Sequence, residues 1–216
     1  MKTVDLFYRN AIKNGMMKTL NGYKNTIVIT NRKLAGNQLL PQLQKILRLH
    51  PQALILRETD LPDEEYEMLA KETMRMCEKE NVLCFLHSRI AMAHKIGCRY
   101  IHLPLMLLTK TMSLDAAHPN ANLLQHGFER ISVSCHSMED VKAAVAWGAT
   151  QIVLGTVFAT ESKKGVEGRG LGFVREICNA CPVPVYAIGG ITPDNLPSVL
   201  EAGAEGGCMM SGFMKL

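Results

Sequence analysis

Short apolar runs alternate with longer amphipathic segments along most of the chain. The runs are rich in β-branched residues and almost continuously apolar, which is typical of parallel strands buried on both faces. They predict strands at 26–30, 53–56, 82–86, 100–103, 131–134, 151–154, 183–188 and 207–210. Between them, apolar residues recur at helical spacing, as in Leu39, Leu43, Ile46 and Leu47.

This repeating order of strand and helix predicts an α/β fold, the (β/α)8 TIM barrel, in a single domain over residues 1–216. A doubly wound open sheet is the alternative with the same order of elements. We expect the barrel to occupy residues 26–212 and to be preceded by an extra N-terminal helix and turn over residues 1–24. The chain stops soon after the eighth strand, so we expect a shortened or missing eighth helix. The N-terminal helix would cover part of that gap.

Several helix ends can be placed from the residue types found there. Residues 61–65 contain a proline followed by acids, which favours a helix start, and we expect this helix to run to about Glu80. Thr192 is the predicted N-cap of a later helix, with Pro193 at its first position. For residues 105–125 we expect an irregular or short helical connection.

Composition and charge are those of a globular domain with a sizeable core. The chain is 47% hydrophobic and 20% charged, with a net charge of +4. This charge permits an anionic small-molecule ligand, and without dense basic runs it does not indicate nucleic-acid binding. No apolar stretch approaches the roughly 20 residues that cross a membrane, and the N-terminus lacks a signal-peptide pattern. We therefore expect a cytoplasmic protein with no nucleic-acid or membrane partner.

The seven cysteines are odd in number and scattered through apolar segments, which predicts reduced thiols. Cys178 and Cys181 form a CxxC pair, a spacing that can bind metal or carry out redox chemistry. No second pair accompanies it, and it lies at a predicted helix end before Pro182. We favour packing thiols here and predict no metal site.

Small residues follow the last two predicted strands. Gly189 and Gly190 come after the seventh strand, and Ser211 and Gly212 come after the eighth. Glycines let backbone N–H groups approach a ligand closely, and the loops after strands seven and eight form a recurring phosphate site in barrels. The alternative is that these glycines only turn the chain. We favour phosphate binding, because both loops carry small residues together.

Polar side chains also follow other strands at the same edge of the predicted sheet. His136 comes directly after 131–134, and histidine suits proton transfer near neutral pH, although a lone histidine is often a packed or surface residue. Arg57 ends the second strand as a fixed cation that suits phosphate or carboxylate. Lys163 and Lys164 lie in a glycine-flanked loop, where one of them could reach an anion or both could simply be solvated.

Six segments together resemble the thiamine phosphate synthase/TenI superfamily, and the TenI branch more closely. The resemblance extends from about Thr26 to Gly212. The TenI-like features are the KKGVEGRG sequence and the histidine of VSCHS. The matching segments are ITNRKL (29–34), LRETDLPDEEYEMLAK (56–71), VSCHS (133–137), GTVFATESKKGVEGRG (155–170), YAIGGITPDN (186–195) and MMSG (209–212).

Members of this superfamily are (β/α)8 barrels that act on thiazole phosphates in thiamine biosynthesis, and the resemblance implies both for this chain. His136 matches the acid/base histidine of the family. Arg57 and Lys163 match basic residues that face substrate anions. The other residues that we predict to bind substrate or phosphate lie in matching segments: Ser134, Thr160, Gly189, Gly190, Ser211 and Gly212.

The sequence departs from the synthase pattern around the expected magnesium site. Synthases have a lysine where this chain has Thr59, and an Asn-Asp pair where it has His87 and Ser88. They also have an acidic residue within the segment that reads HLPLML at 102–107. Magnesium prefers oxygen ligands, chiefly carboxylates and phosphates, so loss of both acids disfavours the synthase reaction.

The resemblance to the TenI branch implies a thiazole tautomerase that needs no metal or other cofactor. Such an enzyme aromatises a 2-carboxy-thiazole phosphate tautomer by acid/base proton transfer. One alternative is a thiamine phosphate synthase, which would use magnesium to couple a thiazole phosphate to a pyrimidine diphosphate. Another is a non-catalytic, regulatory binder of thiamine-related phosphates. The predicted partner is a small-molecule thiazole phosphate, and a homodimer is one way to cover the surface beside an incomplete eighth helix.

Overall fold

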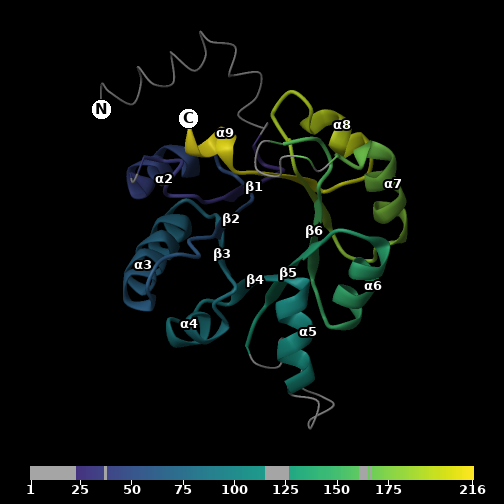
Figure 1. Cartoon of the computed structure of the whole chain (residues 1–216). Coiled ribbons are helices and arrows are strands. Elements are labelled where there is room, and N and C mark those ends of the chain that lie inside the picture. The colour runs from purple at the N-terminus through teal and green to yellow at the C-terminus, as the bar shows by residue number, and fades with distance from the viewer. Residues whose placement is uncertain (1–22, 37, 115–126, 161–164, 166) are drawn as a thin grey trace.

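Eight parallel strands form a closed barrel in chain order, and the last strand pairs with the first. The computed structural model of the chain describes residues 23–36, 38–114, 127–160, 165 and 167–216. Helices lie outside the ring of strands (Figure 1). The (β/α)8 prediction is confirmed, and the open sheet is excluded. The predicted helix over residues 1–24 falls outside the described part of the chain, apart from its last two residues.

Each predicted apolar run overlaps one observed strand, and the ends differ by no more than two residues. Adjacent strands pair in parallel register, for example Ile27 with Ala53 and Ile27 with Cys208. The strands are β1 (Thr26–Ile29), β2 (Ala53–Leu56), β3 (Leu83–His87), β4 (Tyr100–Pro104), β5 (Arg130–Cys135), β6 (Gln151–Gly155), β7 (Val185–Ile188) and β8 (Gly206–Met209).

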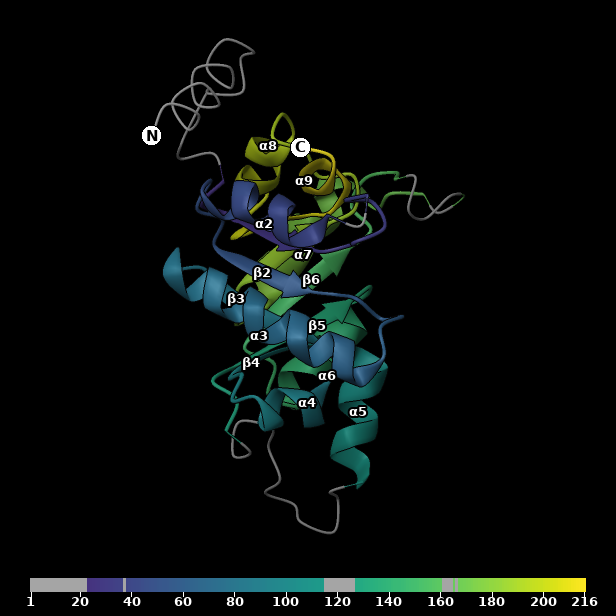
Figure 2. The ribbon, with the colours of Figure 1, turned by 90° about the vertical axis from the view of Figure 1, so that its left-hand side faces the viewer.

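One helix follows each strand within the described residues. α3 lies across β2 and β3 on the outside of the barrel (Figure 2). None of the helices is both long and apolar enough to cross a membrane in the described ranges. The helices are α2 (Leu39–Leu47), α3 (Asp63–Lys79), α4 (Ile90–Lys95), α5 (Leu105–Leu114), α6 (Met138–Ala146), α7 (Gly170–Ala180), α8 (Leu196–Glu201) and α9 (Ser211–Met214).

The structure refines two of the predicted connections. The unclear segment after β4 begins as the helix α5, and residues 115–126 lie outside the described part. The predicted N-cap of α8 is wrong, because the helix begins at Leu196 rather than after Thr192. Before it, the Asn195 side chain closes a turn: its Oδ1 accepts from the Thr192 N–H at 2.9 Å, and its Nδ2 donates to the Gly190 carbonyl at 2.8 Å.

The alternation of side chains along each strand divides the apolar residues into two cores. The larger core lies between strands and helices, and includes Val28, Leu54 and Leu86. The smaller core fills the barrel interior with Ile27, Ile29, Ala53, Ile55, Phe85, Val153, Tyr186 and Cys208. Successive interior positions are two residues apart. The interior residues nearest the carboxyl ends of the strands therefore form the mouth of the barrel above this core.

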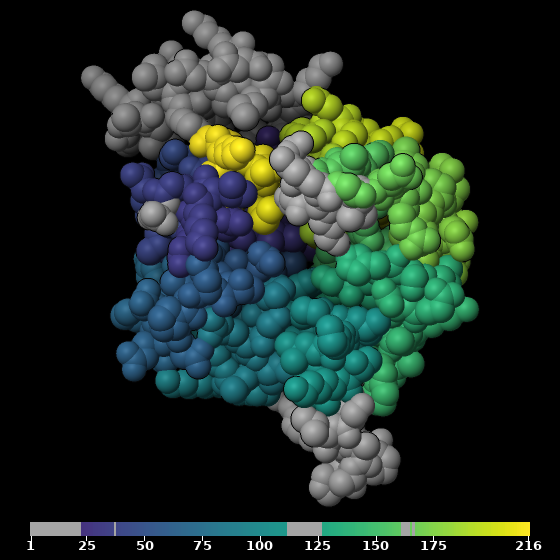
Figure 3. All heavy atoms as spheres, in the orientation of Figure 1, coloured from purple at the N-terminus to yellow at the C-terminus, as the bar shows by residue number. Residues whose placement is uncertain are grey.

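The eighth helix is shortened, as predicted, and α2 packs beside it. Gln42 of α2 donates through Nε2 to the carbonyls of Phe213 at 2.7 Å and Leu216 at 3.2 Å. The Tyr23 ring lies 5.5 Å from the Phe213 ring. Figure 3 shows α9 directly beside α2 on the molecular surface. These contacts give α9 a place on the barrel despite its four residues.

Replacing Gly206 with alanine should destabilise the fold by about 1–3 kcal/mol, because a Cβ there would lie 2.0 Å from the backbone oxygen of Asn25. The matched control is Gly172→Ala in α7, where nothing lies within 4 Å and alanine favours the helix by up to about 1 kcal/mol. Urea unfolding of both variants measures the difference. Equal midpoints would show that the β8–β1 contact has room for a side chain.

Candidate active site

The carboxyl ends of the strands bring polar side chains together at the barrel mouth. Arg57 and His87 lie two residues beyond the interior residues Ile55 and Phe85 on β2 and β3. His102 lies two residues beyond Tyr100, which also packs on the interior core. From β5, Ser134 and His136 follow the same alternation. The end of the barrel to which these strands point is where barrel enzymes build their active sites.

His136 is held by three hydrogen bonds. Its Nδ1 lies 2.7 Å from the carbonyl oxygen of Gly155 at the end of β6. Because a carbonyl only accepts, Nδ1 carries the proton of the neutral ring and Nε2 keeps its lone pair. The main-chain N–H donates to the Asp140 carboxylate at 2.7 Å, and the carbonyl accepts from the Arg169 guanidinium. Nε2 has no partner within the described residues, so the exposed ring can accept a proton there.

The turn after β5 explains how the sequence places this ring. Ser137 caps α6 by accepting from the Asp140 N–H at 3.1 Å, while the Asp140 carboxylate returns to the His136 N–H. This reciprocal pattern resembles a capping box. On the other side, Arg169 stacks on the Phe173 ring at 3.7 Å from its Cζ to the ring centroid. The turn and the start of α7 therefore both restrain the His136 backbone.

His102 is a buried histidine with both ring nitrogens occupied. Nδ1 lies 2.8 Å from the Ser132 hydroxyl oxygen, and Nε2 lies 2.9 Å from that of Ser134. A neutral ring has one donor and one acceptor, so one serine accepts and the other donates. Burial lowers the His102 pKa to about 3, and the charges of His87 and Arg57 add to this effect. The ring is therefore neutral at physiological pH and orients Ser134.

His87 lies against His102, with 5.5 Å between the ring centroids and 30° between the ring planes. Its Nδ1 is buried and has no hydrogen-bond partner within the described residues, whereas Nε2 is not buried. Burial lowers the His87 pKa to about 4, and the nearby Arg57 charge lowers it further. Neither His87 nor His102 was among the predicted site residues. Their strand-end positions, like that of His136, were the available signal.

Arg57 reaches this pair from β2 and is itself exposed. The main-chain N–H of Arg57 donates to the Thr30 hydroxyl at 2.9 Å, and that hydroxyl donates to the Glu58 carboxylate at 2.7 Å. Glu58 is 4% exposed and also accepts from the Arg32 N–H at 3.0 and 3.1 Å. The buried carboxylate therefore links the ends of β1 and β2. Because its oxygens already accept hydrogen bonds within the protein, it is not available to bind a ligand.

The residues predicted to bind phosphate lie on neighbouring strand ends. Gly189 and Gly190 follow β7 with φ of +104° and +64°, and Ser211 and Gly212 open α9 after β8. A Cβ at Gly189 would lie 2.5 Å from Thr156, so packing alone requires glycine there. The N–H groups of both glycines donate to no other described residue. Geometry thus supports a turning role and also leaves donors for an anion.

Two predicted residues lie in the loop between β6 and α7. Thr160 is half-buried near the end of the described part of this loop. Lys163, with its neighbour Lys164, lies outside the described residues, so the structure does not place its side chain. The CxxC pair at the end of α7 consists of free thiols, and burial raises the Cys178 pKa to about 11, with a further contribution from Cys181.

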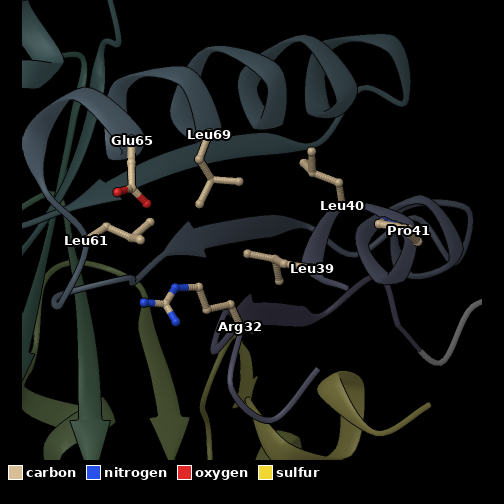
Figure 4. Close-up of a pocket in the computed structure, with 7 residues that line it drawn as sticks. All are labelled: Arg32, Leu39, Leu40, Pro41, Leu61, Glu65 and Leu69. Carbon is tan, nitrogen blue, oxygen red and sulfur yellow. The ribbon is translucent and has the colours of Figure 1, made fainter. Parts of the chain in front are cut away.

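A separate groove of about 370 Å³ lies outside the barrel between α2 and α3. In Figure 4, Leu39 and Leu40 from α2 face Leu61 and Leu69 on the other side. Arg32 lines the groove, and its guanidinium pairs with Asp60 at 3.0 Å. None of the histidines at the barrel mouth lines it, so this groove is not the candidate active site.

Stability should fall as the pH drops from about 6.5 toward 4, because the unfolded chain then binds protons that the folded His87 and His102 resist. Each ring contributes up to about 1.4 kcal/mol per pH unit. Urea unfolding at pH 7 and 4.5 should show a loss that is about 1–3 kcal/mol smaller in His102→Gln. The exposed His94→Gln on α4 is the control, and an equal loss in all three proteins would contradict the neutral, buried imidazole.

The chain and its barrel fold have counterparts in known proteins. A thiamine-phosphate synthase-like protein of Aquifex aeolicus is 32% identical over 87% of this chain and 96% of its own length. A thiamine-phosphate synthase of Pyrococcus horikoshii is 30% identical over 87% and 85%. The structure of a thiamine phosphate pyrophosphorylase from Pyrococcus furiosus has a TM-score of 0.71 at 24% identity, covering 92% of this chain and 91% of its own. The family described as thiamine monophosphate synthase matches residues 26–213, and this chain belongs to that family.

Proposed function

We propose that this protein is a metal-independent thiazole tautomerase of thiamine biosynthesis. It aromatises the 2-carboxy-thiazolylidene ethyl phosphate tautomer to 2-carboxy-4-methylthiazol-5-yl ethyl phosphate. The observation that carries the proposal is the geometry of His136, whose ring is fixed through Nδ1 and keeps Nε2 open at the barrel mouth. Family membership supports a thiazole phosphate as the substrate class.

The reaction needs one group that accepts a proton and then returns it. His136 Nε2 takes the proton from ring carbon two, and the electron pair of that C–H bond shifts through the ring toward the exocyclic carbon. The resulting imidazolium keeps its Nδ1–H bond to the Gly155 carbonyl, which favours the cation. The same proton is then delivered to the exocyclic carbon, so the isomerisation is balanced. General acid–base catalysis of this kind typically contributes about 10²–10⁴-fold.

The phosphate would be bound on the β7–β8 side of the mouth. The free N–H groups of Gly189 and Gly190 can donate to its oxygens, and Ser211 and Gly212 begin the adjacent helix. Thr160 and Lys163 come from the neighbouring loop and would complete the phosphate site. Ser134, oriented by His102, would contact the thiazole ring between the two sides.

The names of the relatives favour the synthase reaction as a second candidate. That reaction uses magnesium on a diphosphate, and the residues present here do not fit it. His87 and Ser88 stand in place of the expected Asn-Asp pair, and the segment 102–107 contains no carboxylate. No group of His, Cys, Asp and Glu suited to a metal ion occurs in the described part of the chain. This donor set supports the tautomerase over the synthase.

The test is to incubate the purified protein with the thiazole tautomer phosphate in EDTA and follow aromatisation by proton NMR. We expect acceleration by the parent protein, and a loss of about 10²–10⁴-fold in His136→Gln with phosphate binding retained. The control is His94→Gln, which removes an exposed imidazole from α4 and should leave the rate unchanged.

Each alternative gives a different result in the same material. Full activity in His136→Gln would refute the assigned role of this residue. No acceleration by the parent, together with magnesium-dependent formation of thiamine phosphate, would identify a synthase. Binding without turnover, unaffected by the His136 change, would identify a regulatory binder.

A further inference from the structure

Two polar side chains at the barrel mouth, His87 and Arg57, have no part in the proposed proton transfer or phosphate binding. In a ring of eight strands, β3 and β4 lie four strands away from β7 and β8, directly across the barrel. A barrel of this size has an interior just wide enough for side chains, so a small ligand at the mouth spans from one wall to the other. A molecule held by its phosphate at β7 and β8 therefore presents its far end to His87 on β3, and Arg57 approaches His87 from the neighbouring strand β2.

His87 is arranged to contact a ligand. Stacking on His102 fixes its ring, and no side chain in the described residues bonds to either ring nitrogen. Buried polar atoms without partners are rare and costly, which makes an unpaired imidazole at a strand end a functional candidate. Buried donors without partners are rarer than acceptors, so the neutral ring is best assigned its proton on Nε2. Because Nε2 is not buried, an N–H at this position is open to a ligand.

The charges around His87, His102 and Arg57 suit a ligand group with one negative charge. Arg57 supplies a fixed cation close enough to depress the His87 pKa, and the two histidines are neutral. The acid next to Arg57, Glu58, is buried and already bonded to the Thr30 hydroxyl and the Arg32 N–H. One guanidinium and one neutral N–H donor match a singly charged, planar carboxylate. They do not match a diphosphate, which carries more charge and needs a metal ion.

We propose that His87 is a specificity-determining residue that, together with Arg57, binds a carboxylate at the end of the substrate opposite the phosphate. This inference rests on the proposed function for the identity of that carboxylate. The inference goes beyond the proposed function because it assigns carboxylate recognition to a histidine in the position that the synthase pattern gives to asparagine.

The experiment compares two ligands by titration calorimetry. One is 2-carboxy-4-methylthiazol-5-yl ethyl phosphate, and the other is the same thiazole phosphate without the carboxylate. The parent should bind the carboxylated ligand about tenfold or more tightly, as a charged hydrogen bond predicts. His87→Leu should lose most of this preference while its affinity for the second ligand stays within about twofold. His87→Gln keeps a donor and should retain much of the preference, and His94→Leu should behave as the parent.

An unchanged preference in His87→Leu, or equal binding of both ligands by the parent, would overturn the proposal. So would an equal loss in His87→Gln and His87→Leu, provided that their thermal unfolding midpoints match. Tight binding of inorganic pyrophosphate that requires magnesium and is abolished by His87→Leu would replace the carboxylate with a metal diphosphate.

The proposal and the proposed function fail in different ways. The binding preference does not depend on turnover and can be repeated in a His136→Gln background. A His87-dependent carboxylate preference in a protein that does not accelerate aromatisation would retain the carboxylate subsite and reject the tautomerase. Acceleration without such a preference would retain the tautomerase and reject the subsite.

Discussion

Closure of the sheet between β8 and β1 is the constraint on which the rest of the structure depends. Only a closed ring places the ends of β7 and β8 across the mouth from β3 and β4. The pairing is made by Thr26 with Gly207 and Val28 with Met209, beside glycines that leave no room for a side chain. The chain spends only four residues on α9, and Gln42 from α2 binds the carbonyls at its end. A short final helix is thus compatible with a closed barrel, because a side chain of the earlier helix α2 donates hydrogen bonds to the carbonyl groups at its end.

The barrel mouth combines one imidazole that has an open ring nitrogen with several groups held by hydrogen bonds. Hydrogen bonds to three different segments restrain His136, so little reorganisation would be needed for Nε2 to act in the proposed reaction. Preorganisation of this kind lowers the cost of reaching a reactive geometry. Across the mouth, the half-buried His87 and the buried His102 are neutral, and Arg57 on the neighbouring strand β2 carries a charge beside them. The side chains described on that side, two imidazoles and a guanidinium, are not the carboxylate oxygens that magnesium prefers.

The fold could be predicted from the sequence because its signal is repeated eight times. Apolar runs and helical spacing reflect local backbone geometry, so they can be recognised from the order of the residues alone. The start of α8 was predicted too early because Asn195 closes a separate turn before the helix. A threonine followed by a proline is typical of both a turn and a helix start, so the sequence alone does not distinguish the two. Strand ends also predicted that Arg57 and His136 share one edge. Proximity of His87 and His102 depends on the register between β3 and β4, which no residue pattern specified.

The position of His102 between two serines has a consequence for the kinds of atom that Ser134 can meet. If the proton of the ring lies on Nε2, Ser134 accepts it and its own hydroxyl hydrogen is free to donate. If the proton lies on Nδ1, Ser134 gives its hydrogen to the ring and presents lone pairs instead. Both arrangements satisfy every bond at His102 and carry the same net charge. Ser134 can therefore present either a donor or an acceptor to a ligand at the barrel mouth without any change in the net charge of the site.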